Sequence, residues 1–597
     1  MPAYRAPSSD YRFLLTELFD TSRLATFAGY EEATTDLLVS VIDEAGKFAG
    51  EVLQPLNMTG DAEGCTWENG VVRAPKGFKD AFKAYADAGW IGLSCDAGHG
   101  GQGLPTVVRA AVNEIVCGAN LSFAMYPGLT AGAFETIERH GNDELKHRYL
   151  PRLVTGEWTG TMCLTEAHAG TDLGIIRTKA VPMDDGSFSV TGQKIFITSG
   201  EHDLSSNIIH LVLAKLPDAP AGTKGISMFL VPKFLPNADG SVGARNGVTC
   251  GSIEHKMGIK GSATCVLNFD QAKGWLVGEP HKGLRAMFTM MNGARLDVGL
   301  QGLGLAHASY CGAVEYARER VQGRALSGVK NPDGPADPII EHADIRRGLL
   351  QMRSFIEGAR ALSVFCSLAL DDELKHPDPA ARENAAGLVA LLTPIIKAYF
   401  TDMAFDATNI GMQTLGGHGY IREYGMEQFV RDARIGQIYE GTNHVQAMDL
   451  VGRKLGQGNG ALLRYYAGLV AEEQAQCAAH PSLAPWRAIL EQASQRLISA
   501  TQTLNTRAKA NPDELGAGAS EYLRLFGYVA MGHMWLRTAR VALERKAAGG
   551  TFDAAYYDTK LATARFWFER MMPHTASLLD CVAAGGASIL EFPREGY

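Results

Sequence analysis

Four short segments of this 597-residue chain combine glycine with hydroxyl, aromatic, amide or carboxylate side chains, and they span residues 162–172, 194–200, 413–420 and 431–446. Glycine and threonine in the first would let backbone N–H groups and hydroxyls approach a polar ring edge or a phosphate. The second is typical of a strand with an aromatic and a hydroxyl on one face, and the third has glycines that suit a close backbone approach. The fourth contains the carboxylate of Glu440.

Each segment also has an ordinary structural explanation. Gly416 and Gly417 could end a helix, Thr198 could lie on a strand surface, and Glu440 could be a solvated carboxylate in a turn. The sequence Gly-Leu-Gly at 302–304 lies in an apolar helical stretch rather than after a strand, so helix packing explains it better than a dinucleotide fingerprint. The histidines are dispersed and the cysteines unpaired, so no metal site is predicted.

The elements that must position these segments fall into four parts. Residues 1–157 have helical periodicity, and residues 158–280 contain short β-rich runs separated by Gly, Pro and Asp, as in an antiparallel sandwich or barrel. Long helical patterns return over 281–455, and further amphipathic helices fill 456–597. The predicted fold is therefore mainly α, with an inserted β domain and an additional C-terminal helical domain.

Composition and charge narrow the possible partners and the compartment. The net charge of −9 gives no basic field for nucleic acid, and residues 456–597 carry 14 basic against 13 acidic side chains. The ten scattered cysteines form no C-x-x-C pair, which favours a reducing compartment. We find no apolar core for a signal peptide and no uncharged run of about 20 residues for a membrane span, so a cytoplasmic protein is expected.

Taken in order, the four segments resemble the acyl-CoA dehydrogenase family over roughly residues 30–455. The resemblance implies a helical N-terminal domain, a central β-barrel or sandwich and a C-terminal helical bundle, with FAD between the last two. It also implies FAD-dependent α,β-dehydrogenation of an acyl-CoA thioester to the trans-2-enoyl-CoA. The layout of about 600 residues is similar to the long bacterial subgroup that includes 3-(methylthio)propanoyl-CoA dehydrogenases. The expected substrate is that thioester or a short- to medium-chain acyl-CoA, in fatty-acid or dimethylsulfoniopropionate catabolism.

The resemblance also assigns residues to the cofactor and the substrate. The implied FAD contacts are Met162, Leu164, Thr165, Gly170, Thr171, Phe196, Thr198, Arg320, Gln413, Gly416, Gly417 and Thr442. Of these, Arg320 and the loop at 413–417 would reach the FAD of a neighbouring subunit, which implies a homodimer or tetramer. Substrate contacts are implied at Thr171, Arg295 and Gly441.

The family motifs are matched with a few departures. Ala167 replaces the usual proline, and Thr171 replaces serine but keeps the hydroxyl. Phe196 stands where tryptophan is usual and keeps an aromatic face, whereas Gly323 stands where phenylalanine often follows the arginine segment. The cofactor contacts are therefore expected to survive.

The family reaction needs a positioned base, because an α-C–H is a poor acid. The resemblance assigns this role to Glu440, whose pKa an apolar pocket would raise. Some relatives place the base just before the arginine equivalent to Arg295, but that position here is Ala294, which cannot take a proton. The base therefore falls to Glu440.

The electron acceptor and the C-terminal extension complete the expectations. Electron-transferring flavoprotein is the expected acceptor. Two alternatives stay open: an acyl-CoA oxidase that returns electrons to oxygen, and a DNA-associated flavoprotein of the same fold with little catalysis. The aromatic-rich helices of residues 456–597 need a surface to bury them, so we expect them to pack on the core and steady a dimer.

Overall fold

The protein is described by a computed structural model that covers residue 2 and residues 4–597. Its contacts divide the chain into two compact units. Unit 1 contains Met1–Gly46, Ala110–Gly118 and Val298–Tyr597, and unit 2 contains Lys47–Arg109 and Ala119–Asp297. Three helices contribute to both units, and these are α2 (Thr35–Phe48), α5 (Thr106–Ala119) and α8 (Gly283–Glu319). The division at 157, 280 and 455 stays a prediction.

A seven-stranded sheet forms the core of unit 2. Its strands are β3 (Trp158–Cys163), β4 (Lys179–Pro182), β5 (Phe188–Thr198), β6 (Asn207–Lys215), β7 (Ile226–Pro232), β10 (Val248–Ile253) and β11 (Thr264–Val277). The pairing runs from β11 through β5, β4, β6 and β7 back to β11, so the sheet closes on itself. This confirms the predicted β domain. The sheet is not wholly antiparallel, because β3 pairs with β6 in parallel across the long connection that contains β4 and β5.

Helices and small hairpins complete unit 2. They are α3 (Pro55–Glu63), α4 (Phe78–Asp87), α6 (Leu121–His140), α7 (Asp143–Val154), the hairpin of β1 (Thr66–Glu68) and β2 (Val71–Arg73), and the hairpin of β8 (Phe234–Pro236) and β9 (Val242–Arg245). Helix α6 packs on β3 so closely that a Cβ on Gly160 would lie 2.3 Å from the Cβ of Ala133. Trp158, Leu211 and Met287 belong to the apolar cluster beneath this contact. Burial of this cluster holds β3 in place, and with it the loop that follows.

Long helices dominate unit 1. They include α9 (Ala343–Lys375), α10 (Pro379–Thr414), α11 (Met426–Arg434) and α12 (Asn443–Asp449). The helical pattern that begins at about residue 281 forms one long continuous helix, α8. Glycine at 304 suits packing, because a Cβ there would lie 2.6 Å from the carbonyl oxygen of Glu114. Helix packing is thus the correct explanation of the Gly-Leu-Gly sequence.

Helix α10 is the one described helix that is long and apolar enough to cross a membrane. Within the most apolar 18 residues, 78% are buried inside the protein. A core helix satisfies the same criteria of length and composition.

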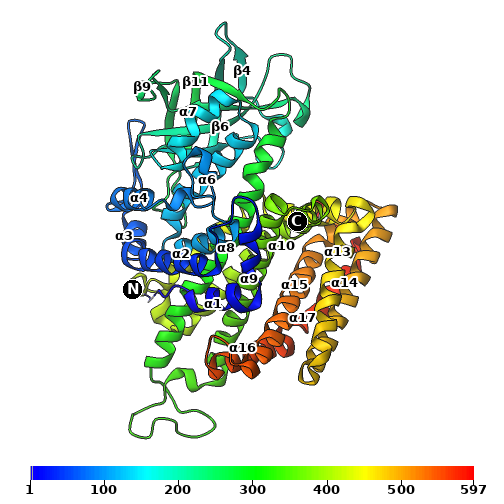
Figure 1. Cartoon of the computed structure of the whole chain (residues 1–597). Helices are drawn as coiled ribbons and strands as arrows, with labels where there is room; N and C mark the ends of the chain where they lie inside the picture. The colour runs from blue at the N-terminus through cyan, green and yellow to red at the C-terminus, as the bar shows by residue number, and fades with distance from the viewer. Residues whose placement is uncertain (1, 3) are drawn as a thin grey trace. The chain divides into compact units, whose positions relative to one another are not determined.

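The C-terminal extension is helical and packs within unit 1. Figure 1 shows α13 (Ala461–Gln476), α14 (Ala484–Ala510), α15 (Asp513–Ala548) and α17 (His574–Ala584) as neighbouring helices, with α16 (Ala554–Phe566) beside α9. The short helices α1 (Ser8–Phe13) and α18 (Ala587–Leu590) lie near the two ends of the chain. Trp535 is buried and donates from Nε1 to the carbonyl oxygen of Ser354, 2.9 Å away. Packing of the extension on the core is therefore confirmed.

Buried charges also link the extension to the rest of unit 1. The Lys560 ammonium on α16 donates to Asp10 and to Glu357, the latter at 2.9 Å. Arg360 on α9 is buried as well and donates to Asp10 and to Glu114. Removing one member would leave a buried charge without compensation, so this network resists separation of the extension.

Candidate active site

In unit 2 the structure brings the first two predicted segments together. The loop after β3 lies along the end of β5, because the Lys194 ammonium donates to the carbonyl oxygen of Leu164 at 2.9 Å. The backbone N–H of Ile195 donates to the carbonyl oxygen of Thr165, also at 2.9 Å. Thr165 is therefore held beside the residue that precedes Phe196, and Leu164 and Met162 pack against the apolar cluster of the sheet.

A buried ion pair fixes this loop. Lys194 Nζ lies 2.8 Å from Glu166 Oε1, and the two side chains are 0% and 5% exposed. The carboxylate of Glu166 also accepts from the Thr178 hydroxyl at 2.6 Å and from the Arg177 N–H at 2.7 Å. Burial alone would raise the pKa of Glu166, but Lys194 and these hydrogen bonds outweigh it and lower the pKa to about 2. Glu166 is thus a permanent anion that organises the loop.

Phe196 stands out from β5 because the strand is irregular there. The register against β11 shifts between the partners of Cys265 and Leu267, and Phe196 has a left-handed φ of 58°. Such a bulge re-aims a side chain, and the phenyl ring is 60% exposed. Thr198 follows at the half-buried end of the strand, and Gly170 and Thr171 are exposed. An exposed aromatic face flanked by hydroxyls and a glycine fits the ring and polar edges of FAD.

In unit 1 the structure brings the third segment close to the end of α8. The hydroxyl of Tyr316 lies 2.7 Å from Nδ1 of His418, which follows Gly416 and Gly417. Arg320 is one helical turn beyond Tyr316 and is exposed, as is Gln413 at the end of α10. Gly416 has a φ of 59°, and a Cβ on either glycine would meet open space. The exposed arginine, amide and glycines fit a phosphate-bearing ligand at this surface.

Glu440 lies in a left-handed turn between two helices of unit 1. Glu440 has a φ of 56° and Gly441 a φ of 84°. Helix α12 begins directly afterwards, and the Thr442 hydroxyl caps it by accepting from the Val445 N–H at 3.3 Å. A non-glycine residue in this conformation is costly, so surrounding contacts must hold it there, and such residues cluster at functional sites. Glu440 itself is half-buried.

Several side chains that the sequence analysis did not single out hold the turn. Lys397 donates to the carbonyl oxygen of Gly441 at 2.7 Å, and Gln446 donates from Nε2 to that of Glu440 at 3.1 Å. The hydroxyl of Tyr439 donates to the side-chain oxygen of Gln301 on α8. Lys397 could have been noticed, because it is the sole charge within the apolar run at 391–400.

Arg295 lies in the part of α8 that belongs to unit 2. Its side chain is 7% exposed, with the guanidinium 5.9 Å from the centre of the Phe288 ring. Its Nη1 donates to the Asn292 side-chain oxygen at 3.5 Å. This burial argues against a solvated ion pair on the helix surface. Ala294 precedes it, as expected from the sequence.

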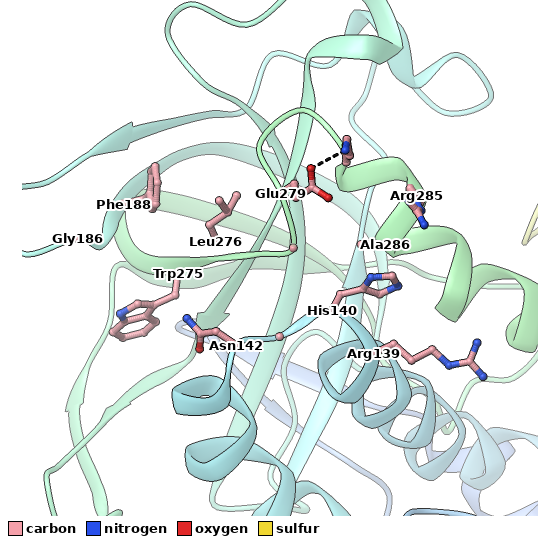
Figure 2. A pocket seen from close by; sticks show the side chains of 13 residues that line it. Arg139, His140, Asn142, Gly186, Phe188, Trp275, Leu276, Glu279, Arg285 and Ala286 are labelled. Atoms are coloured by element: carbon pink, nitrogen blue, oxygen red, sulfur yellow. Dashed lines mark hydrogen bonds and ion pairs between the residues drawn. The ribbon is translucent and has the colours of Figure 1, made fainter.

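One open pocket of about 610 Å³ in unit 2 lies apart from these residues. It is lined by the end of α6, the start of α8 and the end of β11, and none of the predicted site residues lines it. Figure 2 shows Arg139, Arg285 and Trp275 around it, with Glu279 paired to Lys282. This pocket is therefore separate from the predicted site residues.

Known family models match segments of both units. Family models match as follows: "Acyl-CoA dehydrogenase, N-terminal domain" over 39–157, "middle domain" over 161–272, "C-terminal domain" over 281–455, and "Acetyl-CoA dehydrogenase C-terminal like" over 469–593. The chain belongs to the acyl-CoA dehydrogenase family. It is an FAD-dependent enzyme that dehydrogenates acyl-CoA thioesters.

Full-length relatives of this acyl-CoA dehydrogenase include two bacterial enzymes. The chain is 41% identical to 3-methylmercaptopropionyl-CoA dehydrogenase of Ruegeria pomeroyi, over 98% of this chain and 99% of that one. It is 36% identical to a butyryl-CoA dehydrogenase of Syntrophomonas wolfei, over 98% of each. A crystal structure of acyl-CoA dehydrogenase with FAD from Bacillus anthracis has a TM-score of 0.76 at 21% identity, covering 98% of this chain and 92% of that one. This likeness extends the shared fold through the C-terminal extension.

Proposed function

We propose that Glu440 is the base that removes the α-proton of the acyl-CoA thioester. The observation that carries this assignment is its left-handed turn, in which backbone strain is maintained by the contacts of Lys397 and Gln446. Such geometry aims the side chain at a fixed position, which general base catalysis requires. Ala294 occupies the alternative base position and carries no titratable group.

We propose the flavin contacts that the family resemblance implies, and the geometry within unit 2 supports several of them. Phe196 presents its exposed ring to the flavin, and Thr165, Thr171 and Thr198 offer hydroxyls to its polar edges. The buried pair of Glu166 and Lys194 keeps this loop against β5. When bound, FAD supplies the acceptor for the β-hydride. The remaining proposed FAD contacts are Met162, Leu164, Gly170, Arg320, Gln413, Gly416, Gly417 and Thr442.

For the substrate we propose 3-(methylthio)propanoyl-CoA, with short- to medium-chain acyl-CoAs as the wider class. Support comes from the full-length identity of 41% to the Ruegeria enzyme, beside 36% to a butyryl-CoA dehydrogenase. Thr171, Arg295 and Gly441 are the proposed substrate contacts. The backbone N–H of Glu440 would donate to the thioester oxygen and stabilise the enolate that forms.

We further propose that electrons leave to an electron-transferring flavoprotein and that the enzyme is a cytoplasmic homodimer or tetramer. Exposure of Arg320, Gln413, Gly416 and Gly417 supports contact with a neighbouring subunit's FAD. All ten cysteines are free thiols, which supports a reducing compartment.

The test of the base assignment is Glu440→Gln. This variant keeps the size and hydrogen-bonding capacity of the side chain but cannot accept a proton. We expect full FAD content and a loss of dehydrogenation on the order of 10⁴-fold, measured with an electron-acceptor dye. Near-normal turnover would overturn the assignment.

A further inference from the structure

The backbone conformation of the Glu440 turn is unfavourable, and the reaction itself does not show what stabilises it. Glu440 and Gly441 are consecutive residues with left-handed φ, at 56° and 84°. A Cβ on Gly441 would lie 2.8 Å from Nε2 of Gln446, so the backbone is closely packed on one side. Since non-glycine residues avoid this conformation, specific contacts must stabilise the peptide on each side of Glu440.

Lys397 supplies the strongest of these contacts. It lies in the middle of α10, is fully buried, and its ammonium donates to the Gly441 carbonyl oxygen at 2.7 Å. The same ammonium donates to Oδ1 of Asn443 at 2.8 Å. Lys397 thus holds the Gly441–Thr442 peptide, one residue beyond the proposed base, as well as the first residue of α12.

The partner of this lysine is itself immobilised. Nδ2 of Asn443, which has two hydrogens to donate, lies within hydrogen-bonding distance of three acceptors: the carbonyl oxygen of Ala398 at 3.2 Å, the Thr401 hydroxyl at 3.0 Å and Asp402 Oδ1 at 2.7 Å. All three acceptors lie on α10, within the five residues that follow Lys397. The turn is therefore fastened to one rigid helix rather than to a loop, and a site supported in this way keeps its geometry.

The charge of Lys397 strengthens its hold on the turn. A charged donor makes stronger hydrogen bonds to carbonyl oxygens than a neutral one does. The ammonium of Lys397 therefore holds the Gly441 carbonyl oxygen more firmly than a neutral amide at this position would.

We propose that Lys397 is the positioning residue for the Glu440 turn, holding the base in its working conformation through the Gly441 carbonyl. This inference rests on the proposed role of Glu440 as base. Lys397 acts through the backbone of the turn, so its loss should slow proton abstraction far more than it weakens the binding of flavin or substrate.

The test uses the FAD-loaded full-length enzyme with Lys397→Met. Displacing a catalytic group by about 1 Å costs about 100-fold in rate, so we expect anaerobic flavin reduction by butanoyl-CoA to slow by about that factor. FAD content should stay near the wild-type value, because most of the proposed FAD contacts lie outside the turn, and the substrate concentration at half-saturation should change much less than the rate. Lys397→Gln keeps one N–H donor without the charge and should lose about 10-fold.

Lys560→Met is the matched control, because Lys560 is another buried lysine of unit 1 that bonds Asp10 and Glu357 instead of the turn. It should lower thermal stability without slowing flavin reduction. The proposal is overturned if Lys397→Met and Lys397→Gln reduce flavin at the wild-type rate, or if neither yields FAD-loaded protein, since Lys397 would then serve the fold. Activity in Glu440→Gln would instead defeat the base assignment, so the two failures are distinguishable.

Discussion

Two glutamates, one in each unit, are both served by a buried lysine, but in different ways. In unit 2 Lys194 bonds the side-chain carboxylate of Glu166 and, through Leu164, the loop around it. In unit 1 Lys397 bonds the backbone carbonyl beside Glu440. A carboxylate that is locked in an ion pair stays ionised and serves structure. The turn that carries Glu440 is instead held through its backbone, at the Gly441 carbonyl oxygen.

Among variants that test this difference between the two lysines, Lys194→Met is expected to have the largest effect on stability. It leaves the Glu166 carboxylate buried without its cation, so we expect the free energy of unfolding to fall by about 3–5 kcal/mol. The loop after β3, which contains Leu164 and Thr165, should loosen, and FAD should be lost on gel filtration. Chemical denaturation of the apo and FAD-loaded forms measures both effects.

A double variant provides the control for that experiment. Lys194→Met combined with Glu166→Gln removes the unpaired charge and should recover part of the lost stability. Equal stability of the single variant and the wild type would show that the pair does not organise the loop.

The stability of the protein in acid tests whether the Glu166 carboxylate serves the fold. The pKa of Glu166 is lowered to about 2 in the folded protein, against about 4.3 unfolded, so its contribution is present above pH 4 and is lost as the pH falls towards 2. The contribution is about 3 kcal/mol at most by this difference. We expect wild type to lose more stability than Glu166→Gln between about pH 4.5 and 2. Parallel pH profiles of the two proteins, from urea unfolding, would contradict the account.

The smallest effect is expected at Gly441→Ala. The left-handed φ of 84° disfavours any side chain, and a Cβ would also lie 2.8 Å from Nε2 of Gln446, so the free energy of unfolding should fall by about 1–2 kcal/mol, more than at a glycine with open space around it. FAD content should change little, because most of the proposed FAD contacts, such as Phe196 and Arg320, lie outside this turn. Gly549→Ala is the control, since Gly549 also has a left-handed φ but a Cβ there meets open space. A similar loss in both variants would show that strain alone, rather than contact with Gln446, sets the cost.

Much of the fold followed from sequence pattern. The change from helical periodicity to short β-rich runs and back predicted the inserted β domain. The glycine-rich sequence at 302–304 was correctly attributed to helix packing, since Gly304 faces the backbone of Glu114. The parallel pairing of β3 with β6 was not foreseen, because sequence texture does not reveal which strands become neighbours.

Sequence motifs were enough to propose the candidate site residues, but not the side chains that support them. Glu440 and Phe196 stand in motifs that resemble a known family. Lys397 is 44 residues from Gly441, and only tertiary packing brings them to 2.7 Å. Likewise, the pairing of Lys194 with Glu166 depends on how the loop after β3 returns to β5. Such contacts leave no local pattern beyond an isolated charge among apolar residues.

Proton exchange at the α-carbon tests the base assignment most directly, because it isolates proton removal from hydride transfer. The substrate is 3,3-dimethylbutanoyl-CoA, which has α-hydrogens but no β-hydrogen to transfer, incubated in D₂O with FAD-loaded enzyme. Mass spectrometry should show deuterium at the α-carbon with the wild type and none above the uncatalysed rate with Glu440→Gln. Exchange by Glu440→Gln at the wild-type rate would show that another group removes the proton.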